Sequence, residues 1–551
     1  MGMRAGIACL PTGSCGILSA MTPNRRQFLG QLSFGTAGLG LVSFAPRSFA
    51  APAGGGASLP RSTPEAEGVV SAGVQAFLEG IARGKHELHS FMLSRHGRVV
   101  SEGWWAPYAP EFNHTLYSMS KSFTSTAVGL AVAEGKLTVD DRVVKFFPKE
   151  LPEKVSELLG AMRVKDLLAM ATGQEKEPTQ PMVKEQNWVK FFLAAPVAHA
   201  PGTVFMYNSG ATYMCSAIVQ QVTGQRMLDY LQPRLFAPLG IVGPTWEQCP
   251  MGRDTGGWGL SVPTEALAKF GQLYLQKGNW HGKQLLPAKW VEEATSFKIQ
   301  QPLAAKPSRP KEKDDWKQGY CYQFWRSQNN AYRGDGAFGQ FTVVLPEQDA
   351  VIAMTAEASN MQGILDLAWE HLLPAMKAQA LPADPAGQGK LQTTLASLAL
   401  SRPEGKGTSP TAERLAGKKF QLEANALGLQ SAQFTLGKGN WVIHLRDAQD
   451  GHQLVGAWNR WSRGETTLPG TPPRLITGGA SKPGTAHKTT GCGAWTDDNT
   501  LELMVRYYEM PHHDSLTCRF EGDRVQLTFL NSIAKQRNGK DSRPVLQGRM
   551  G

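Results

Sequence analysis

The sequence predicts two folded bodies, an α+β domain followed by an all-β module. Strand-like segments lie at both ends of residues 51–380 with helical segments between them, which indicates an antiparallel sheet flanked by helices and a helical subdomain. Residues 381–416 are rich in Pro, Gly, Ser and Ala, with one short helical stretch near 391–400, and indicate a linker. Residues 417–551 hold short strand-like segments separated by turns, which predicts a C-terminal antiparallel β-barrel or sandwich.

The elements of the α+β domain follow from their apolar periods. Residues 89–104 hold two strand-like segments on either side of a short Gly-containing turn, so we expect a β-hairpin. Residues 118–135 have apolar side chains close to helical spacing, and Gly135 is a suitable C-terminal stop for a buried helix. Further helices are predicted over 164–170, 212–222 and 264–276, and further strands over 339–345 and 351–356.

The C-terminal module contains about eight predicted strands. Glu521-Gly522-Asp523 gives the clearest hairpin turn among them. The aromatic residues of the module either fill its core or line a ligand cavity, and core packing is the favoured interpretation. The strands are predicted over 418–423, 432–436, 441–445, 454–461, 493–496, 501–508, 516–520 and 524–529.

The composition excludes several protein classes. Of the 551 residues, 41% are hydrophobic and 19% are charged, which is typical of a folded globular protein. After residue 50 no apolar run approaches the roughly 20 residues of a membrane-spanning helix, so we expect no transmembrane anchor. The net charge is +11, and the first fifty residues hold four arginines and no acid, which leaves +7 without long basic runs. We therefore expect no nucleic-acid partner.

Residues 1–50 have the pattern of a twin-arginine signal peptide. Arg25 and Arg26 precede Phe28-Leu29, a weakly apolar Gly-rich segment and a small-x-Ala site that ends at Ala50. The alternative is a buried N-terminal helix, which the many glycines disfavour. Translation from Met1 and from Met21 are both compatible with this signal. The pattern predicts a periplasmic or secreted bacterial protein.

Five cysteines follow the predicted signal peptide. In an oxidising compartment an odd number leaves at least one thiol without an intramolecular partner. Cys492 and Cys518 lie on predicted strands close in sequence and are the candidate disulfide. The alternative is five buried thiols. The five are Cys215, Cys249, Cys321, Cys492 and Cys518.

Ser118 and Lys121 form a Ser-x-x-Lys at the start of the predicted buried helix. Residues three apart share a helical face, so the amine reaches the hydroxyl, and the helix N-terminus favours an anionic nucleophile. The same spacing at 308–311 and 532–535 does not open a buried helix. The competing interpretation of Ser118 is an ordinary helix cap.

Tyr207 and Ser209 supply a second polar pair in the loop before the next predicted helix. Free Lys and Tyr side chains titrate near pH 10, so each needs a shifted pKa to act as a base at neutral pH. A Lys and a Tyr side chain placed around one serine shift each other's pKa. The competing interpretation of Tyr207 is a buried aromatic residue with a satisfied hydroxyl group.

These motifs resemble those of the class C β-lactamase and penicillin-binding protein family. Residues 117–124, followed by 135–141 and Pro148, are similar to that family's first motif, and the resemblance continues in order over about residues 60–375. Further similar segments are 164–173, 201–210 and 236–240. The resemblance implies a β-lactamase/transpeptidase-like fold without a cofactor. It also implies Ser118 as the acylated nucleophile, Lys121 as a group that helps deprotonate it, and Tyr207 as the proton shuttle to the leaving group.

Two departures from the family pattern bear on the substrate. Ser209 stands where the second motif usually ends in Asn, and the third motif, Lys-Thr-Gly or His-x-Gly, is absent before residue 375. Residues 488–491 read Lys-Thr-Thr-Gly but lie in the all-β module. The pattern over 336–340 resembles nylon-oligomer hydrolases and related esterases. That resemblance implies an oxyanion hole made by the backbone N–H groups of Ser118 and Ala337.

The missing third-motif lysine favours an ester or a linear amide, in a small-molecule or peptide-like substrate, over a β-lactam. In β-lactamases that cation helps to hold the substrate carboxylate, and here Arg333 is the nearby basic residue. The alternatives are a true class C-type β-lactamase or D-Ala carboxypeptidase, and a non-catalytic cell-wall or glycan-binding protein. Candidate substrate contacts are Ser209, Arg333, Gly336, Gln340 and Trp258, with Trp188, Tyr320, Tyr322 and Trp325 as further aromatic residues near the cleft.

No metal or cofactor motif is present in the sequence. It holds no His-Glu-x-x-His, Cys-x-x-Cys or phosphate-binding glycine loop. His512-His513-Asp514 is interpreted as a solvated polar turn rather than a ligand set. The absence of a Gly-x-Ser-x-Gly elbow argues against an α/β-hydrolase.

Overall fold

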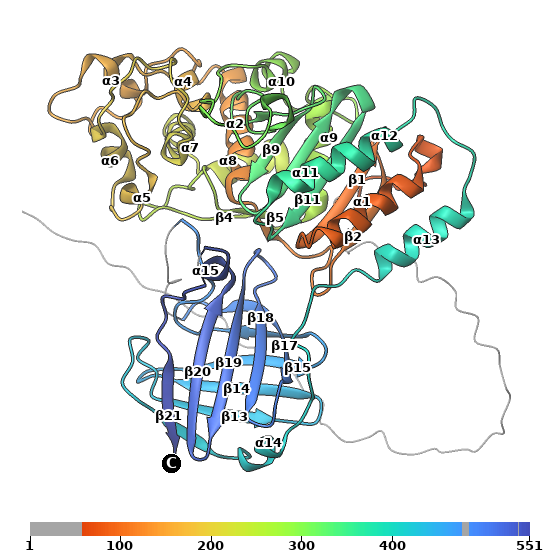
Figure 1. The fold of residues 1–551 in the computed structure, drawn as a ribbon. Coiled ribbons are helices and arrows are strands. Elements are labelled where there is room, and N and C mark those ends of the chain that lie inside the picture. The colour runs from red at the N-terminus through yellow and green to blue at the C-terminus, as the bar shows by residue number, and fades with distance from the viewer. Residues whose placement is uncertain (1–57, 477–483, 538) are drawn as a thin grey trace, which may run out of the picture. The chain divides into compact units, whose positions relative to one another are not determined.

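The computed structural model describes residues 58–476, 484–537 and 539–551 (Figure 1). The predicted signal peptide lies outside the described residues. Among the described helices, none combines the length and apolar character that a bilayer crossing requires.

The α+β prediction is confirmed by a six-stranded sheet in the order β2-β1-β11-β10-β9-β8. Every neighbouring pair is antiparallel, and the first strand pairs with the last, with Phe91 opposite Met354 and Met92 opposite Ala353. Adjacent residues on a strand point to opposite faces, so the two pairs enter two different cores. The strands are β1 (Leu88–Arg95), β2 (Arg98–Trp104), β8 (Trp325–Arg326), β9 (Tyr332–Gly336), β10 (Gln340–Leu345) and β11 (Ala350–Ala356).

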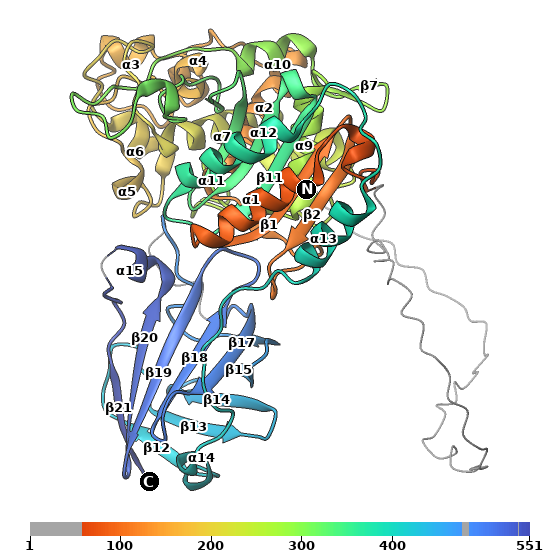
Figure 2. The same cartoon turned by 45° about the vertical axis from the view of Figure 1, so that its right-hand side comes forward.

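Helices cover both faces of this sheet (Figures 1 and 2). On one face pack α1 (Ser71–Arg83) and α11 (Met361–Leu367), which continues into α12 (Leu373–Ala375). On the other face α9 (Thr264–Leu275) contacts β1, β10 and β11. The sheet is therefore buried on both sides.

The helical subdomain is built around α2 (Ser120–Ala133) and α7 (Ser209–Thr223), which pack against each other. A short 3₁₀ turn, η2 (Tyr117–Met119), precedes α2, and Gly135 follows it at φ +68°, as expected for a helix stop. The remaining elements are β3 (His114–Thr115), α3 (Glu157–Ala161), α4 (Val164–Leu168), α5 (Thr179–Met182), α6 (Trp188–Ala194), α8 (Met227–Leu231), β4 (Thr245–Trp246), β5 (Leu260–Val262), β6 (Asn279–Trp280), β7 (Lys283–Gln284) and α10 (Ala288–Thr295).

The segment predicted as a linker holds two helices, α13 (Pro385–Ala396) and α14 (Pro410–Arg414). Leu391 and Leu395 of α13 are buried, and the helix packs on α1 and β2 (Figure 2). Part of this Pro- and Gly-rich stretch therefore belongs to the packed body of the first domain.

The C-terminal module is a β-barrel, which was one of the two predicted alternatives; the other was a sandwich. Nine strands form a closed ring, β12-β13-β14-β15-β17-β18-β19-β20-β21, and the ring closes through a parallel pairing of β15 with β17. A tenth strand, β16, pairs with β17, and α15 (Ser532–Arg537) follows β20. The predicted strands are present, and β16 and β21 were missed. The bounds are β12 (Lys419–Leu422), β13 (Ser431–Leu436), β14 (Asn440–Arg446), β15 (Gly451–Trp458), β16 (Ser462–Thr466), β17 (His487–Trp495), β18 (Thr500–Arg506), β19 (His513–Glu521), β20 (Arg524–Asn531) and β21 (Leu546–Met550).

The candidate disulfide between Cys492 and Cys518 is wrong. All five cysteines are free and buried, as the alternative stated. Cys492 is opposite Met504 and Cys518 is opposite Leu501, so strand β18 separates them. Strands two positions apart are about 10 Å from each other, beyond the roughly 7 Å between Cα atoms that a disulfide bridges.

Closure of the barrel depends on a glycine contact between β15 and β17. A Cβ atom at Gly491 would lie 2.1 Å from the carbonyl oxygen of Val455 and 2.9 Å from Cα of Gly456. We expect Gly491→Ala to lower the free energy of unfolding by about 1–3 kcal/mol because the backbone there has to shift. Thermal or urea unfolding measures this. Gly451→Ala is the control, because a Cβ at Gly451 meets no atom within 4 Å. Equal stability of the two variants would contradict the expectation.

Candidate active site

Ser118 lies in the η2 turn, directly before helix α2, and its side chain is half-buried. Strand β9 approaches this turn closely. A Cβ at Gly336 would lie 2.1 Å from the carbonyl oxygen of Leu116 and 3.1 Å from the amide nitrogen of Met119. The glycine therefore allows β9 to lie against the start of the helix.

Lys121 joins the polar groups of the site. Its Nζ atom lies 3.2 Å from Ser118 Oγ and 3.0 Å from Ser209 Oγ, and it donates a hydrogen bond to the carbonyl oxygen of Gly257 at 2.6 Å. The side chain is buried, and burial lowers the pKa of its amine to about 7, although the charges of Glu177 and Asp335 act in the opposite direction. A neutral amine within hydrogen-bond reach of a serine hydroxyl is suited to general-base catalysis.

Tyr207 lies on the other side of the amine, with its ring centroid 5.0 Å from Lys121 Nζ. Burial raises the pKa of the Tyr207 phenol, and a hydrogen bond with Ser118 offsets part of that rise. Tyr207 therefore keeps its proton at neutral pH and is placed as a proton donor, whereas Lys121 is the better proton acceptor. The structure thus brings together the predicted residues Ser118, Lys121, Tyr207 and Ser209.

Asn208 and Ser209 have different roles at the start of helix α7: Asn208 caps the helix, and Ser209 contacts Lys121. The Asn208 side chain accepts a hydrogen bond from the Ala211 amide at 2.9 Å and caps the helix. Ser209, the next residue, therefore faces the amine of Lys121. This explains how a hydroxyl group occupies the place where the family motif usually offers an amide.

Ala337 lies in the β9–β10 turn and is partly exposed. Gln340 donates to the carbonyl oxygens of Ala337 at 2.9 Å and Ala356 at 2.7 Å, so its side chain supports this turn from inside. Phe338, which follows Ala337, has φ +69°, and Tyr117, which precedes Ser118, has φ +47°. Such a conformation costs a non-glycine residue about 1–3 kcal/mol and persists where the surroundings hold it.

Three predicted substrate contacts, Arg333, Gln340 and Trp258, lie in the protein interior, and the side chain of Gln340 is used by the two carbonyl oxygens described above. Arg333 is fully buried, and its guanidinium donates to Asp335 Oδ2 at 2.9 Å and to Ser327 Oγ at 2.6 Å. Burial raises the pKa of Asp335 to about 6, although Arg333 acts in the opposite direction. Trp258 is 2% exposed and donates to Glu247 at 3.2 Å. None of the three side chains lies at a surface where it could meet a substrate carboxylate or acyl group.

Aromatic side chains form a cluster around Tyr207. Its ring stacks on Trp325 at a centroid distance of 5.5 Å, and Tyr320 and Phe205 pack on the same cluster. Tyr320 and Trp325 were predicted near the cleft. The other predicted aromatic residues pack elsewhere: Trp188 lies against Trp258, and Tyr322 against Trp290.

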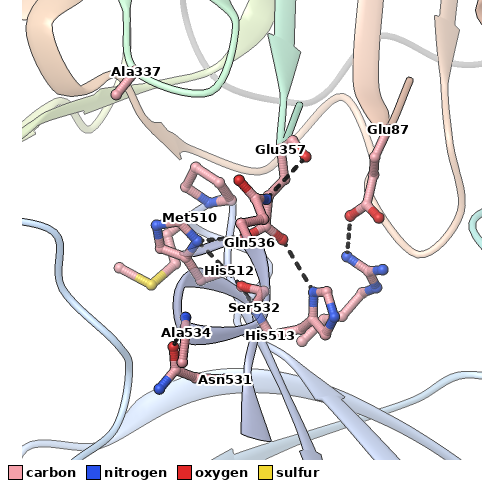
Figure 3. Close-up of polar contacts among 12 residues, drawn as sticks. Glu87, Ala337, Glu357, Met510, His512, His513, Asn531, Ser532, Ala534 and Gln536 are labelled. Atoms are coloured by element: carbon pink, nitrogen blue, oxygen red, sulfur yellow. Dashed lines mark hydrogen bonds and ion pairs between the residues drawn. The ribbon is translucent and has the colours of Figure 1, made fainter. Parts of the chain in front are cut away.

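The expectation of a solvated turn at residues 512–514 is wrong. His512 is completely buried, and its Nδ1 atom lies 2.6 Å from Glu357 Oε1, while His513 Nδ1 lies 3.0 Å from Glu357 Oε2 (Figure 3). Nε2 of His512 accepts a hydrogen bond from the hydroxyl group of Tyr117, the residue that precedes Ser118. Sequence alone offers no signal for this contact, because Glu357 lies 155 residues away.

In the part of the chain that the structure describes, one group has metal-ligand geometry: Glu87, Glu357 and His513. Arg506 Nη1 lies 2.6 Å from Glu87 Oε1 and already supplies a positive charge there. A second cation beside this guanidinium is electrostatically unfavourable, so we assign no metal to the group.

Comparison with known proteins gives matches over the first domain. The family model described as Beta-lactamase matches residues 75–373. The chain is 26% identical over 289 residues to the 6-aminohexanoate-dimer hydrolase of Paenarthrobacter ureafaciens, across 48% of this chain and 71% of that protein. It is 25% identical over 158 residues to a beta-lactamase of Escherichia coli (strain K12), across 27% and 40%. A penicillin-binding protein homologue from Caulobacter crescentus matches with a TM-score of 0.45 and 17% identity, across 57% of this chain and 100% of that chain.

The lowered pKa of Lys121 predicts how the reactivity of Ser118 depends on pH. The amine accepts the serine proton when it is neutral, so the rate of labelling by a fluorophosphonate should rise with pH and be half-maximal near pH 7. Intact-mass kinetics between pH 5 and 9 measure the rate. Lys121→Arg stays protonated and should label at least about 100-fold more slowly.

Glu177→Gln provides the matched control for this profile. The charge of Glu177 raises the Lys121 pKa, and its Oε1 atom accepts from the Ser209 amide at 3.2 Å, a contact that Gln retains. The midpoint should therefore move to lower pH without loss of the limiting rate. A flat profile, or a midpoint near pH 10 in the parent protein, would exclude Lys121 as the base.

Proposed function

The chain belongs to the Beta-lactamase family, as its motifs indicated, and from this premise we propose that it is a serine hydrolase that cleaves an ester or a linear amide through an acyl-enzyme on Ser118. The observation that carries the proposal is the contact of Lys121 Nζ with Ser118 Oγ at 3.2 Å, together with the pKa of about 7 that burial gives this amine. A helix cap needs neither a buried lysine nor a lowered pKa.

The proposed reaction uses these residues in two halves. Neutral Lys121 takes the proton of Ser118, whose Oγ attacks the carbonyl carbon, and the N–H groups of Ser118 and Ala337 stabilise the oxyanion. Tyr207 gives its proton to the leaving oxygen or nitrogen and regains one from Lys121. Water then attacks the carbonyl carbon of the acyl-enzyme while Lys121 Nζ takes a proton from the water. Protonated Lys121 returns that proton to Ser118 Oγ as the ester bond breaks and the acid product is released.

The substrate class is argued from charge and from the aromatic cluster. A β-lactam antibiotic or a D-Ala terminus carries a carboxylate that needs a cation beside the site. Arg333, the basic residue nearest in sequence to the β9–β10 turn, is buried and paired with Asp335. The cluster of Tyr207, Trp325 and Tyr320 offers an apolar surface beside Ser118, suited to an uncharged acyl group. The relative named as a 6-aminohexanoate-dimer hydrolase supports a linear amide as the bond that is cleaved, but not an uncharged acyl group, because that dimer ends in an amine and a carboxylate.

A panel of probes tests the proposal on the purified protein and on Ser118→Ala. We expect turnover of p-nitrophenyl acyl esters and a fluorophosphonate adduct, both lost by at least about 1000-fold in Ser118→Ala. We expect no penicillin adduct. Penicillin acylation at Ser118 would establish the β-lactamase or carboxypeptidase alternative instead. A folded protein that reacts with none of the probes would support the non-catalytic binding protein.

Tyr207→Phe separates the two proposed proton-transfer roles. Because Tyr207 is the donor to the leaving group, its loss should reduce amide hydrolysis by about 100-fold and affect esters with a p-nitrophenolate leaving group far less. Steady-state kinetics on matched ester and anilide substrates measure the ratio. An equal loss on both would place Tyr207 before the leaving-group step.

We also propose export, on the Arg25-Arg26 signature and the Ala50 site. Replacing both arginines (Arg25→Lys with Arg26→Lys) should retain the precursor in the cytoplasm, as fractionation and intact mass would show. Unchanged export of the double variant would refute this localisation.

A further inference from the structure

The loop between β18 and β19, residues 507–512, is bound to the catalytic domain by main-chain contacts. The Glu509 carbonyl oxygen accepts from the Thr115 amide at 2.9 Å, and the Met510 carbonyl oxygen accepts from the Tyr108 hydroxyl at 2.9 Å. At the base of the loop, buried Arg506 pairs with Glu87. The barrel is thus joined to the first domain by a defined set of buried polar contacts.

The ring of His512, at the end of this loop, contacts four residues: Glu357, Ser532, Tyr117 and Phe338. Its Nδ1 atom bonds to Glu357 Oε1 at 2.6 Å (Figure 3). Since an ionised carboxylate accepts and does not donate, the Nδ1 atom carries the proton, and Nε2 accepts from Tyr117. The imidazole also meets the Phe338 ring edge to face, with centroids 4.9 Å apart.

The two aromatic partners flank the proposed oxyanion hole. Tyr117 precedes Ser118, and Phe338 follows Ala337. Both have left-handed backbone conformations, at φ +47° and +69°, which side-chain-bearing residues keep where neighbours hold them. Their rings lie 5.6 Å apart, and each contacts His512. One imidazole from the barrel therefore touches both strained residues.

We propose that His512 is a positioning residue of the oxyanion hole, holding the backbone N–H groups of Ser118 and Ala337 in place through Tyr117 and Phe338. This role rests on the proposed function. It makes the barrel part of the catalytic apparatus rather than a separate binding module.

Glu357 keeps the His512 ring in the required state. Burial raises the pKa of Glu357, but hydrogen bonds from His512 and His513 outweigh it and hold that pKa at about 2. The carboxylate is therefore ionised at any working pH, and it fixes the orientation of the ring. The main chain beside Glu357 also supports the turn, because the Ala358 amide donates to the Phe338 carbonyl oxygen at 2.9 Å.

His513 provides a matched control. It bonds to the other oxygen of the same carboxylate at 3.0 Å and is buried at the same interface. In the full chain, His512→Ala should lower kcat for a p-nitrophenyl ester by about 10–100-fold with KM changed less than about twofold. His513→Ala should lower the melting temperature comparably, with kcat within about threefold. Equal kcat losses in the two variants would overturn the proposal.

Two further variants test the route through Tyr117. His512→Gln presents an amide N–H to Glu357 and an amide oxygen to Tyr117, so it should recover part of the lost kcat. Tyr117→Phe removes the hydroxyl group alone, and combining it with His512→Ala should cost less than the product of the single effects. Independent, multiplicative effects would argue against this route. These milder variants keep the test decisive if His512→Ala fails to fold.

Hydrogen exchange separates this proposal from the proposed function. His512→Ala or His512→Gln should speed exchange in peptides covering 116–122 and 336–340, and His513→Ala should leave both unchanged. This outcome is expected whether or not the protein hydrolyses any ester. If the parent protein is inactive but exchange responds as stated, the proposed function fails and the positioning role stands. Unchanged exchange in both segments would refute the role.

Discussion

Removal of the Lys121 amine from water is the constraint on which the site depends. Placing an ammonium group in the protein interior costs several kcal/mol, whereas a neutral amine with hydrogen-bond partners costs far less. The hydroxyl groups of Ser118 and Ser209 and the Gly257 carbonyl supply those partners from three separate segments. Helices α2 and α7 therefore have to pack so that Lys121 Nζ reaches Ser209 Oγ. This packing keeps the amine buried and so lowers its pKa.

The part of the site carried by local spacing could be predicted from sequence. Ser118 and Lys121 share one helical face, and Tyr207 and Ser209 lead into the next buried helix, so short motifs were enough. The surroundings of Arg333 and Gln340 could not be predicted in this way, because β9 and β10 are central strands covered on both faces and their polar side chains turn inward. His512 depends on partners 155 and 395 residues away, which no local pattern records.

The fold followed the same division. Strands with clear alternation, such as β14 and β20, were located to within about two residues, because burial on one face imposes a period of two. Strand β16 alternates without apolar residues, and β21 is short, so neither carried that signal. Helix α13 sits in a Pro- and Gly-rich stretch, and two leucines packed against α1 and β2 stabilise it despite a weak local propensity.

The hydrogen bond between Tyr117 and His512 also has a consequence for biosynthesis. The ribosome adds Tyr117 395 residues before it adds the imidazole that contacts it. At about 5–20 residues per second, that interval lasts tens of seconds, and β19 to β21 still have to be added before the ring of strands closes. A truncated chain therefore has Tyr117 without its hydrogen-bond partner, so this contact forms only when the whole polypeptide has been made.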